Sequence, residues 1–212
     1  MGLCQTKLAK NGRVLTPHQK EQLKMTVIIF VIGGPGSGKS TQCKKMAAKY
    51  GFHHVALGDL LRQEGSEATS RGRQIQDIMN KGLLLPAGAI LDILNDNMLS
   101  QPETRGFLVD GFPRDLDQAQ EFEQTVGRLP DAVIALDCET ETLIHRLLLR
   151  GQSGGRADDC ESLLWQRLET HYSMCEAIFA FYHQKRLLFN IPAEEAPENV
   201  LAKCCSVIDH LR

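Results

Sequence analysis

The feature that most constrains the fold is a glycine-rich segment placed between an apolar run and a helix-like stretch. Residues 33–40 have the sequence Gly-Gly-Pro-Gly-Ser-Gly-Lys-Ser and directly follow the apolar run 27–32. This spacing matches the phosphate-binding loop that joins a strand to a helix in nucleotide-binding α/β folds. Glycines allow consecutive backbone N–H groups to face one phosphate, and the beginning of a helix adds its positive dipole end. The segment therefore predicts a site for a nucleoside triphosphate.

Three polar residues are candidates for the metal and phosphate chemistry of this site. Lys39 supplies a mobile positive charge for the outer phosphates, and the Ser40 hydroxyl is a candidate Mg²⁺ ligand. Asp110 follows the apolar pair Leu108 and Val109, which predicts a carboxylate at the carboxyl end of a buried strand. A carboxylate there can hold Mg²⁺ or its waters opposite the loop. The sequence thus predicts Mg²⁺ as the cofactor.

Short apolar runs alternate with helix-like segments along the rest of the chain. The runs lie at residues 108–109, 132–136 and 187–191. A helix over 41–49 is expected to end at Gly51, and residues 58–99 have a mainly helical pattern. Strands that alternate with helices predict an α/β fold, here three layers around a five-stranded parallel sheet with a helical insertion.

Length and composition indicate one globular domain. The chain has 212 residues, of which 42% are hydrophobic and 24% charged. No apolar run approaches the ~20 residues that a spanning helix needs, and the start of the chain is polar and basic, so we expect a cytoplasmic protein. The seven cysteines show neither Cys-x-x-Cys pairs nor zinc-type spacing. We therefore expect neither a disulfide framework nor a structural metal. We also expect the protein to be a monomer.

The first part of the chain differs in charge from the rest. Residues 1–26 contain five basic side chains and one acidic side chain, whereas the whole chain has a net charge of −2. An acidic body argues against nucleic acid as a partner. We interpret residues 1–25 as a basic arm whose Gly2 and Cys4 match an acylation pattern, which predicts peripheral contact with the cytosolic face of the plasma membrane. The alternative is a disordered start that merely carries glycine at position 2.

Arginines gather around a second glycine-rich segment, residues 151–155, which we expect to be a loop. Arg146 and Arg150 are four residues apart and share one helix face, Arg156 follows the loop, and Arg167 lies on the next helix. Arg114 follows Asp110 across a short turn. Planar, multidentate cations suit the charge that spreads over a phosphoryl group in transfer, so this constellation indicates phosphoryl-transfer chemistry.

Five segments in sequence order together resemble the short-lid adenylate kinases of the nucleoside monophosphate kinase family. The resemblance covers the chain from about Thr26 to its end, and no zinc-binding cysteines occur in the lid. The segments are Gly33-Gly34-Pro35-Gly36-Ser37-Gly38-Lys39, Gly58-Asp59-Leu60-Leu61-Arg62, Lys81-Gly82-Leu83-Leu84-Leu85-Pro86, Asp110-Gly111-Phe112-Pro113-Arg114 and Gly155-Arg156-Ala157-Asp158-Asp159.

This resemblance implies reversible, Mg²⁺-dependent phosphoryl transfer from ATP to AMP, giving two ADP, by a kinase domain over 26–212. It implies a monophosphate-binding arm at 58–85 and a short lid at 151–158. The implied catalytic residues are Lys39, Arg114, Arg150, Arg156 and Arg167. The implied ATP-binding residues are Gly34, Pro35, Gly36, Ser37, Gly38, Lys39, Ser40, Thr41, Arg146 and Arg150. The implied AMP-binding residues are Leu57, Arg62, Leu85, Gly111, Arg114, Gln118, Arg156 and Arg167.

Three positions depart from the family pattern. By this resemblance, Ser40 stands at a position where the family usually has glycine, and Gly154 stands where the lid usually has serine. Leu57 stands where the adenine-selective members look to have threonine. Leu57 leaves a uridylate/cytidylate or relaxed specificity open, although Gln118 matches the glutamine that reads adenine. A weakened kinase fold that senses nucleotides at a membrane is a further alternative. A regulatory GTPase is excluded because neither Asn-Lys-x-Asp nor Asp-x-x-Gly occurs.

Overall fold

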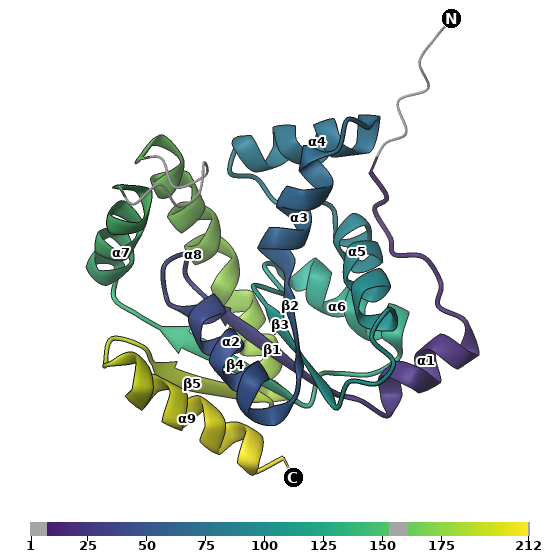
Figure 1. Ribbon diagram of the computed structural model, residues 1–212. Helices are drawn as coiled ribbons and strands as arrows, with labels where there is room; N and C mark the ends of the chain where they lie inside the picture. The colour runs from purple at the N-terminus through teal and green to yellow at the C-terminus, as the bar shows by residue number, and fades with distance from the viewer. Residues whose placement is uncertain (1–7, 153–160, 212) are drawn as a thin grey trace, which may run out of the picture.

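A five-stranded parallel sheet forms the middle layer of the molecule (Figure 1). The computed structural model describes residues 8–152 and 161–211. The strand order β2-β3-β1-β4-β5 confirms the predicted five-stranded parallel sheet. The strands are β1 (Val27–Gly33), β2 (His53–Ala56), β3 (Gly106–Asp110), β4 (Ala132–Asp137) and β5 (Leu188–Pro192).

Helices cover both faces of this sheet. Helices α2 and α9 pack on one face, and α5, α6 and α8 pack on the other (Figure 1). No described helix has the length and apolar character to cross a membrane. The helices are α1 (Pro17–Lys24), α2 (Lys39–Tyr50), α3 (Leu57–Ser66), α4 (Ser70–Asn80), α5 (Ala87–Leu99), α6 (Leu116–Val126), α7 (Thr140–Gln152), α8 (Glu161–Gln184) and α9 (Pro197–Asp209).

The continuous apolar sequence of β1 follows from its position between the two helical layers. Successive side chains of a strand point to opposite faces, so Ile29 and Val31 pack toward α2 and α9, while Ile28 and Phe30 pack toward the other layer. All four side chains have no exposed surface. A strand covered on both faces must be apolar at every position, as parallel sheets generally require.

An aromatic cluster ties the sheet to the loop that follows β3. The ring of Phe30 meets the rings of Phe112 and Phe122 edge-on, at centroid distances of 5.0 and 4.9 Å. The ring of Tyr182 on α8 meets Phe30 at 6.3 Å. Such edge-to-face pairs contribute about 0.5–1.5 kcal/mol each beyond the burial of their area. Because Phe112 lies two residues before Arg114, this cluster fixes the backbone that carries that arginine.

The register of the sheet brings several predicted site residues to one edge. Val31 of β1 and Ala56 of β2 both pair with Asp110, the last residue of β3. Gly33 pairs with Leu136 near the end of β4. All strands are parallel, so their carboxyl ends lie together, where ligands of open α/β sheets bind.

The helical pattern predicted over 58–99 corresponds to α3, α4 and α5. Helices α3 and α4 extend from the sheet edge on one side, and α7 with the start of α8 lies across from them (Figure 1). The Thr69 side chain caps α4 by accepting a hydrogen bond from Gly72 N–H at 2.9 Å. The limits of the arm and lid stay predictions, because residues 153–158 of the lid lie outside the described residues.

Residues 9–16, which we call the N-terminal strap, run along α5 and α6. The N–H groups of Gly88 and Ala89 in the first turn of α5 donate to the carbonyls of Lys10 and Ala9, at 2.8 and 3.1 Å. The residue at the N-cap is Pro86, whose side chain cannot accept a hydrogen bond. The strap backbone therefore takes the place of a capping side chain.

Side chains fasten the strap at further points. Gly12 N–H donates to Glu121 Oε1 at 2.8 Å, and Arg13 N–H donates to Asp92 Oδ1 at 2.8 Å. Leu15 and, beyond the strap, Leu23 of α1 are almost fully buried in the larger core cluster. The described part of the basic arm is therefore packed on the body of the protein.

The Gly88→Ala substitution tests the fit of the strap. A Cβ at Gly88 would lie 2.2 Å from the carbonyl carbon of Asn11, so the strap must move away from α5. We expect a loss of about 1–3 kcal/mol in the free energy of unfolding and faster amide exchange in the strap. Gly65→Ala is the control, because its Cβ would approach no described atom closer than 3.6 Å. Unchanged exchange in the Gly88→Ala protein would contradict this account.

Candidate active site

The phosphate-binding loop is held in shape by close packing on α7. A Cβ at Gly34 would lie 2.5 Å from Leu143 Cδ1, and one at Gly36 would lie 3.0 Å from the Leu143 carbonyl oxygen. Gly36 and Gly38 have φ angles of 88° and 93°, a region that favours glycine. Larger residues would push the loop off α7, which explains the glycines in physical terms.

The beginning of α2 faces open space. A Cβ at Gly38, the N-cap residue, would meet no described heavy atom within 4 Å, and no side chain caps the helix. The first backbone N–H groups of α2 are thus directed toward space that a phosphate can enter. This arrangement agrees with the triphosphate site expected from the sequence.

The Lys39 ammonium group lies inside the loop. Its Nζ donates to the carbonyl oxygens of Gly33 and Gly34, both at 2.8 Å. Burial lowers the pKa of Lys39 to about 8, against the opposing effect of the Asp110 charge. Lys39 is therefore a cation that is only partly solvated at neutral pH. The oxygens of an entering phosphate would interact with its positive charge at short range.

Ser40 and Asp110 meet at the mouth of the loop. The Ser40 hydroxyl donates to Asp110 Oδ2 at 2.5 Å, and His54 Nε2 lies 3.2 Å from the same oxygen. Burial alone would raise the pKa of Asp110, but hydrogen bonds from His54 and Ser40 and the charge of Lys39 bring it below its ordinary value. Asp110 is therefore an ionised carboxylate with two hydrogen-bonding partners.

The sequence analysis did not identify His54. Its position follows from the register of the sheet. His54 is two residues before Ala56, which pairs with Asp110 across strands β2 and β3. Residues two apart on a strand face the same side. His54 and Asp110 therefore share one face of the sheet, which the sequence alone does not reveal before strand pairing is known.

The turn after β3 positions Arg114. Its Nε donates to the Gly111 carbonyl oxygen at 3.1 Å, and its backbone N–H donates to Gln118 Oε1 at 2.9 Å. The Gln118 Nε2 group donates to Asp115 Oδ2 at 3.0 Å. Gln118 is fully buried, so in this conformation its amide orients the Arg114 backbone and does not reach a ligand.

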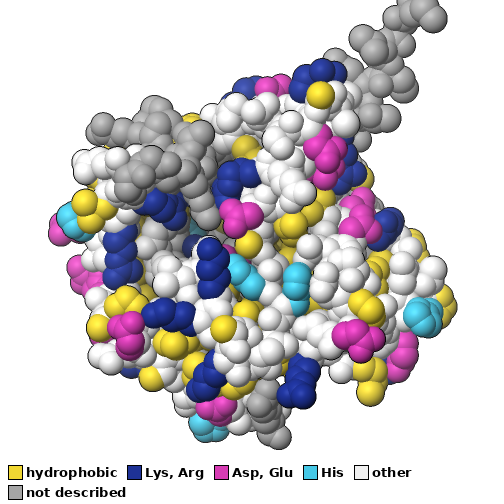
Figure 2. All heavy atoms as spheres, in the orientation of Figure 1, with side chains coloured by type: hydrophobic (Ala, Val, Ile, Leu, Met, Phe, Trp, Pro, Cys, Tyr) yellow, Lys and Arg dark blue, Asp and Glu magenta, His cyan; other side chains and the backbone are white. Residues whose placement is uncertain are grey.

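A cavity of about 590 Å³ extends from the phosphate-binding loop to the predicted monophosphate-binding arm at 58–85. Figure 2 shows Lys and Arg side chains gathered on this face, between the arm and α7. Acidic side chains on the wall, such as Asp59 and Asp110, are fewer than the cations. The described cations on the wall are Lys39, Arg62, Arg114, Arg146, Arg150 and Arg167.

Most of the predicted binding residues line this cavity. On the ATP side they are Pro35, Gly36, Ser37, Gly38, Lys39, Ser40, Thr41, Arg146 and Arg150, and on the AMP side they are Arg62, Leu85, Gly111, Arg114 and Arg167. Gly34 belongs to the loop but packs against Leu143, and the Leu57 side chain is fully buried in the larger core cluster. Neither of these residues, nor Gln118, lines the cavity. Arg156, Gly2 and Cys4 lie outside the described residues.

Two arginines of the wall are already oriented by neighbours. Both terminal nitrogens of Arg146 donate to the Ala193 carbonyl oxygen, each at 3.1 Å. Arg62 forms an ion pair with Asp59 within α3. Because these contacts restrict the side-chain rotamers, the entropy lost on binding a nucleotide is reduced.

His171 of α8 also lines the cavity and was missed by the sequence analysis. A Cβ at Gly34 would lie 3.5 Å from His171 Cδ2, so this ring covers the phosphate-binding loop. Burial, with a contribution from the charge of Lys39, lowers the pKa of His171 to about 4. The ring is therefore neutral at physiological pH. Its spacing of four residues from Arg167, on the same helix face, was the available signal.

Comparison with known proteins decides between the classes of kinase that share this loop. The adenylate kinase family model matches residues 31–187. The chain belongs to the adenylate kinase family. Adenylate kinase isoenzyme 1 of Homo sapiens is 44% identical over 194 residues, which cover 91% of this chain and 100% of that protein. The isoenzyme 1 of Gallus gallus is 45% identical over 192 residues, 90% of this chain and 98% of that protein.

A longer relative shares the same region. Adenylate kinase isoenzyme 5 of Homo sapiens is 43% identical over 192 residues, 90% of this chain but 34% of that protein. These relatives confirm the predicted family and an adenylate kinase enzyme, which transfers a phosphoryl group from ATP to AMP to give two ADP. They do not favour the uridylate/cytidylate kinase or the membrane-associated nucleotide sensor.

The depressed pKa of Lys39 predicts a pH dependence of this adenylate kinase. In the free enzyme the ammonium group loses its proton as the pH rises through about 8, so phosphate binding weakens above that value. We expect kcat/KM for ATP to approach a tenfold fall per pH unit there, since this constant reports groups of the free enzyme. Lys39→Arg should flatten the profile, because arginine stays charged. Lys44→Arg, on the exposed face of the same helix, is the control, and a flat profile in the unmodified enzyme would contradict the assignment.

Proposed function

We propose that ATP and AMP occupy opposite ends of the one cavity, so that their phosphates meet between Lys39 and the wall arginines. The observation that supports this proposal is the continuity of the cavity from the phosphate-binding loop to the arm. ATP lies along the loop with its base near Arg146, and AMP lies against Arg62 and Leu85. Both nucleotides are anions, and the six described cations of the wall offset their repulsion.

The proposed catalysis depends on position and charge. Lys39, Arg114, Arg150 and Arg167, together with Arg156 of the lid, surround the phosphoryl group in transfer and stabilise the charge that spreads over its oxygens. The attacking oxygen belongs to the AMP phosphate and already carries negative charge. For this reason no side chain is assigned as a general base. Closure of the arm and lid excludes water, which would otherwise accept the phosphoryl group.

Ser40 and Asp110 are the residues that we assign to Mg²⁺. Both offer oxygen atoms, which are the ligands that this ion prefers, and the low pKa of Asp110 keeps its carboxylate ionised. When bound with ATP, the ion would neutralise part of the phosphate charge. The Ser40 hydroxyl orients Asp110 and provides a further oxygen.

We propose AMP as the preferred acceptor even though Leu57 lacks a hydroxyl. The Leu57 side chain lies in the core and so presents no apolar wall to the base in this conformation. Gln118 would have to exchange its contacts with Arg114 and Asp115 in order to read adenine. Its side-chain amide has one acceptor oxygen and one NH₂ donor, which match the donor and the acceptor on the edge of adenine.

Arg114→Ala tests the two-nucleotide site. We expect kcat for ADP formation from ATP and AMP to fall about 100- to 1,000-fold, because a donor to the transferred group is lost. The melting temperature should change little, because the Arg114 side chain lies at the cavity wall and not in the core. Arg105→Ala, an exposed arginine away from the cavity, is the matched control. Near-normal turnover by Arg114→Ala would refute its role, and turnover with CMP or UMP equal to that with AMP would refute the selectivity.

We also propose a monomeric cytoplasmic enzyme that is acylated at Gly2 and Cys4. The support is the sequence pattern together with the basic residues that follow it. Protein expressed in eukaryotic cells should carry an acyl group on Gly2 by mass spectrometry and should bind anionic vesicles. Gly2→Ala should abolish both properties. An unmodified Gly2 amine in the original protein would overturn this proposal.

A further inference from the structure

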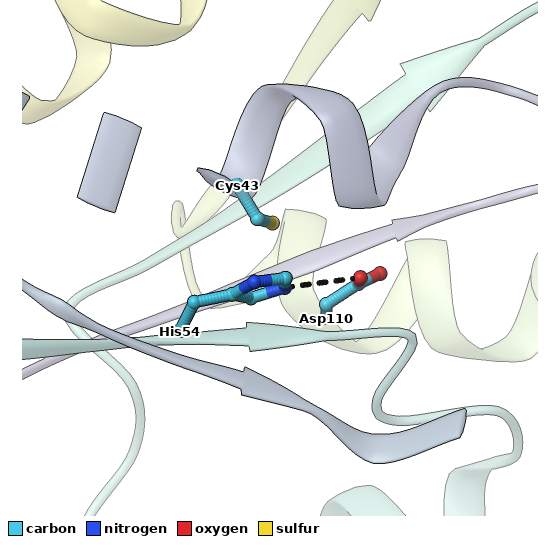
Figure 3. A group of neighbouring side chains, drawn as sticks. All are labelled: Cys43, His54 and Asp110. Atoms are coloured by element: carbon cyan, nitrogen blue, oxygen red, sulfur yellow. Dashed lines mark hydrogen bonds and ion pairs between the residues drawn. The ribbon is translucent and has the colours of Figure 1, made fainter. Parts of the chain in front are cut away.

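Cys43, His54 and Asp110 converge behind the phosphate-binding loop. They come from α2, β2 and β3, and Figure 3 shows the Cys43 sulfur directed toward the imidazole and carboxylate groups. One potential ligand atom from each residue lies within 4.8 Å of the other two. Side-chain exposure is 14% for His54 and 7% for Asp110, and Cys43 is fully buried. The cluster is thus enclosed, and it reaches the cavity through Asp110.

The fold keeps these three groups together for reasons that are independent of any metal. Cys43 lies three residues after Ser40, so both side chains project from neighbouring positions on one face of α2. The Ser40 hydroxyl contacts Asp110, and His54 contacts the same carboxylate oxygen. Strands β2 and β3 are paired in the sheet, and the core residues around Cys43 are apolar.

The ligand types differ from those that Mg²⁺ selects. A thiolate, an imidazole and a carboxylate are the ligands of Zn²⁺, at about 2.0–2.3 Å from the ion, whereas Mg²⁺ prefers oxygen alone. A tetrahedral ion at those distances places ligand atoms about 3.3–3.8 Å apart. The ligand atoms, now within 4.8 Å of one another, have to approach by about 1–1.5 Å when the ion binds. One thiolate and one carboxylate also balance the charge of a divalent cation, which a buried site requires.

We propose that this adenylate kinase binds one Zn²⁺-type cation through Cys43 Sγ, His54 Nε2 and an Asp110 carboxylate oxygen. Binding forms one metal–sulfur, one metal–nitrogen and one metal–oxygen bond, and a water occupies the fourth position. The Cys43 thiol releases its proton to solvent. The neutral His54 ring loses the Nε2 proton that it donates to Asp110 and takes up a proton from solvent on Nδ1, so the hydrogen bond between His54 and Asp110 breaks. No electron is transferred. The site is distinct from the Mg²⁺ site but shares Asp110 with it.

Occupation of this site inhibits phosphoryl transfer. The cation draws the Asp110 carboxylate away from the Ser40 hydroxyl and places a second divalent charge close to Lys39, whose charge senses both Asp110 and Cys43. This consequence rests on the proposed role of Asp110 with Mg²⁺. The binding of the cation does not, so the two can fail separately.

Cobalt absorption and calorimetry test the binding directly. The reduced full-length chain, freed of metal, should take up one Co²⁺ with a thiolate-to-cobalt charge-transfer band in the near ultraviolet, and Zn²⁺ should displace it. Cys43→Ala should remove the band and weaken Zn²⁺ binding at least about 100-fold, since loss of a direct ligand exceeds the usual loss of an outer partner. Cys205→Ala, another buried cysteine outside the cluster, is the matched control and should retain both properties.

Turnover with Mg²⁺ and added Zn²⁺ gives the second measurement. Zn²⁺ should inhibit the original enzyme and Cys205→Ala equally, whereas Cys43→Ala should resist, which separates this site from zinc bound to ATP itself. If Cys43→Ala does not fold, His54→Gln replaces it in the binding measurements, because glutamine can still donate to Asp110 but lacks the imidazole nitrogen. Absence of the band in the original protein, its persistence in Cys43→Ala, or an unchanged Zn²⁺ affinity in His54→Gln would overturn the proposal.

Discussion

Parallel pairing of β1 with β3 places a backbone loop and a carboxylate at the same edge of the sheet. Val31 lies opposite Asp110, and the chain then leaves β1 through the glycines that pack on α7. A shift of the pairing by one residue would reverse the faces of Asp110 and of the apolar residues before it. Because both faces of the sheet are buried, such a shift would place an ionised group in the core, so the register is strongly enforced.

The cations of the cavity wall are satisfied within the protein even without nucleotides. Lys39 is held by two loop carbonyls, Arg146 by the Ala193 carbonyl and Arg62 by Asp59. Phosphates that bind Lys39 or Arg62 therefore have to replace existing hydrogen bonds. Since phosphate oxygens carry more charge than carbonyl oxygens, the replacement is favourable. The net gain in binding free energy is nevertheless smaller than the number of cations would imply, because the existing hydrogen bonds are lost.

Local patterns accounted for much of the fold and for part of the site. The loop at 33–40 is recognisable because its function needs particular residues in consecutive positions, and Asp110 is recognisable because a strand ends there. His54 and His171 were missed because their importance depends on which strand or helix lies opposite. Side-chain direction set the other limit: Leu57 and Gln118 stand at family positions, yet their side chains are buried away from the cavity. The strap was likewise invisible, because its contacts are made by backbone groups to residues about 80 positions away.

The strap gives the enzyme a mechanical connection that its sheet does not provide. Helix α5 follows the arm directly, and its first turn is held by the carbonyls of Ala9 and Lys10. A load on the N-terminal end of the chain would thus pass to α5 and α6, through these two peptide hydrogen bonds and those of Gly12 and Arg13, before it reached β1. The segment before the first strand and the helix that follows the arm are therefore joined directly, through backbone groups alone.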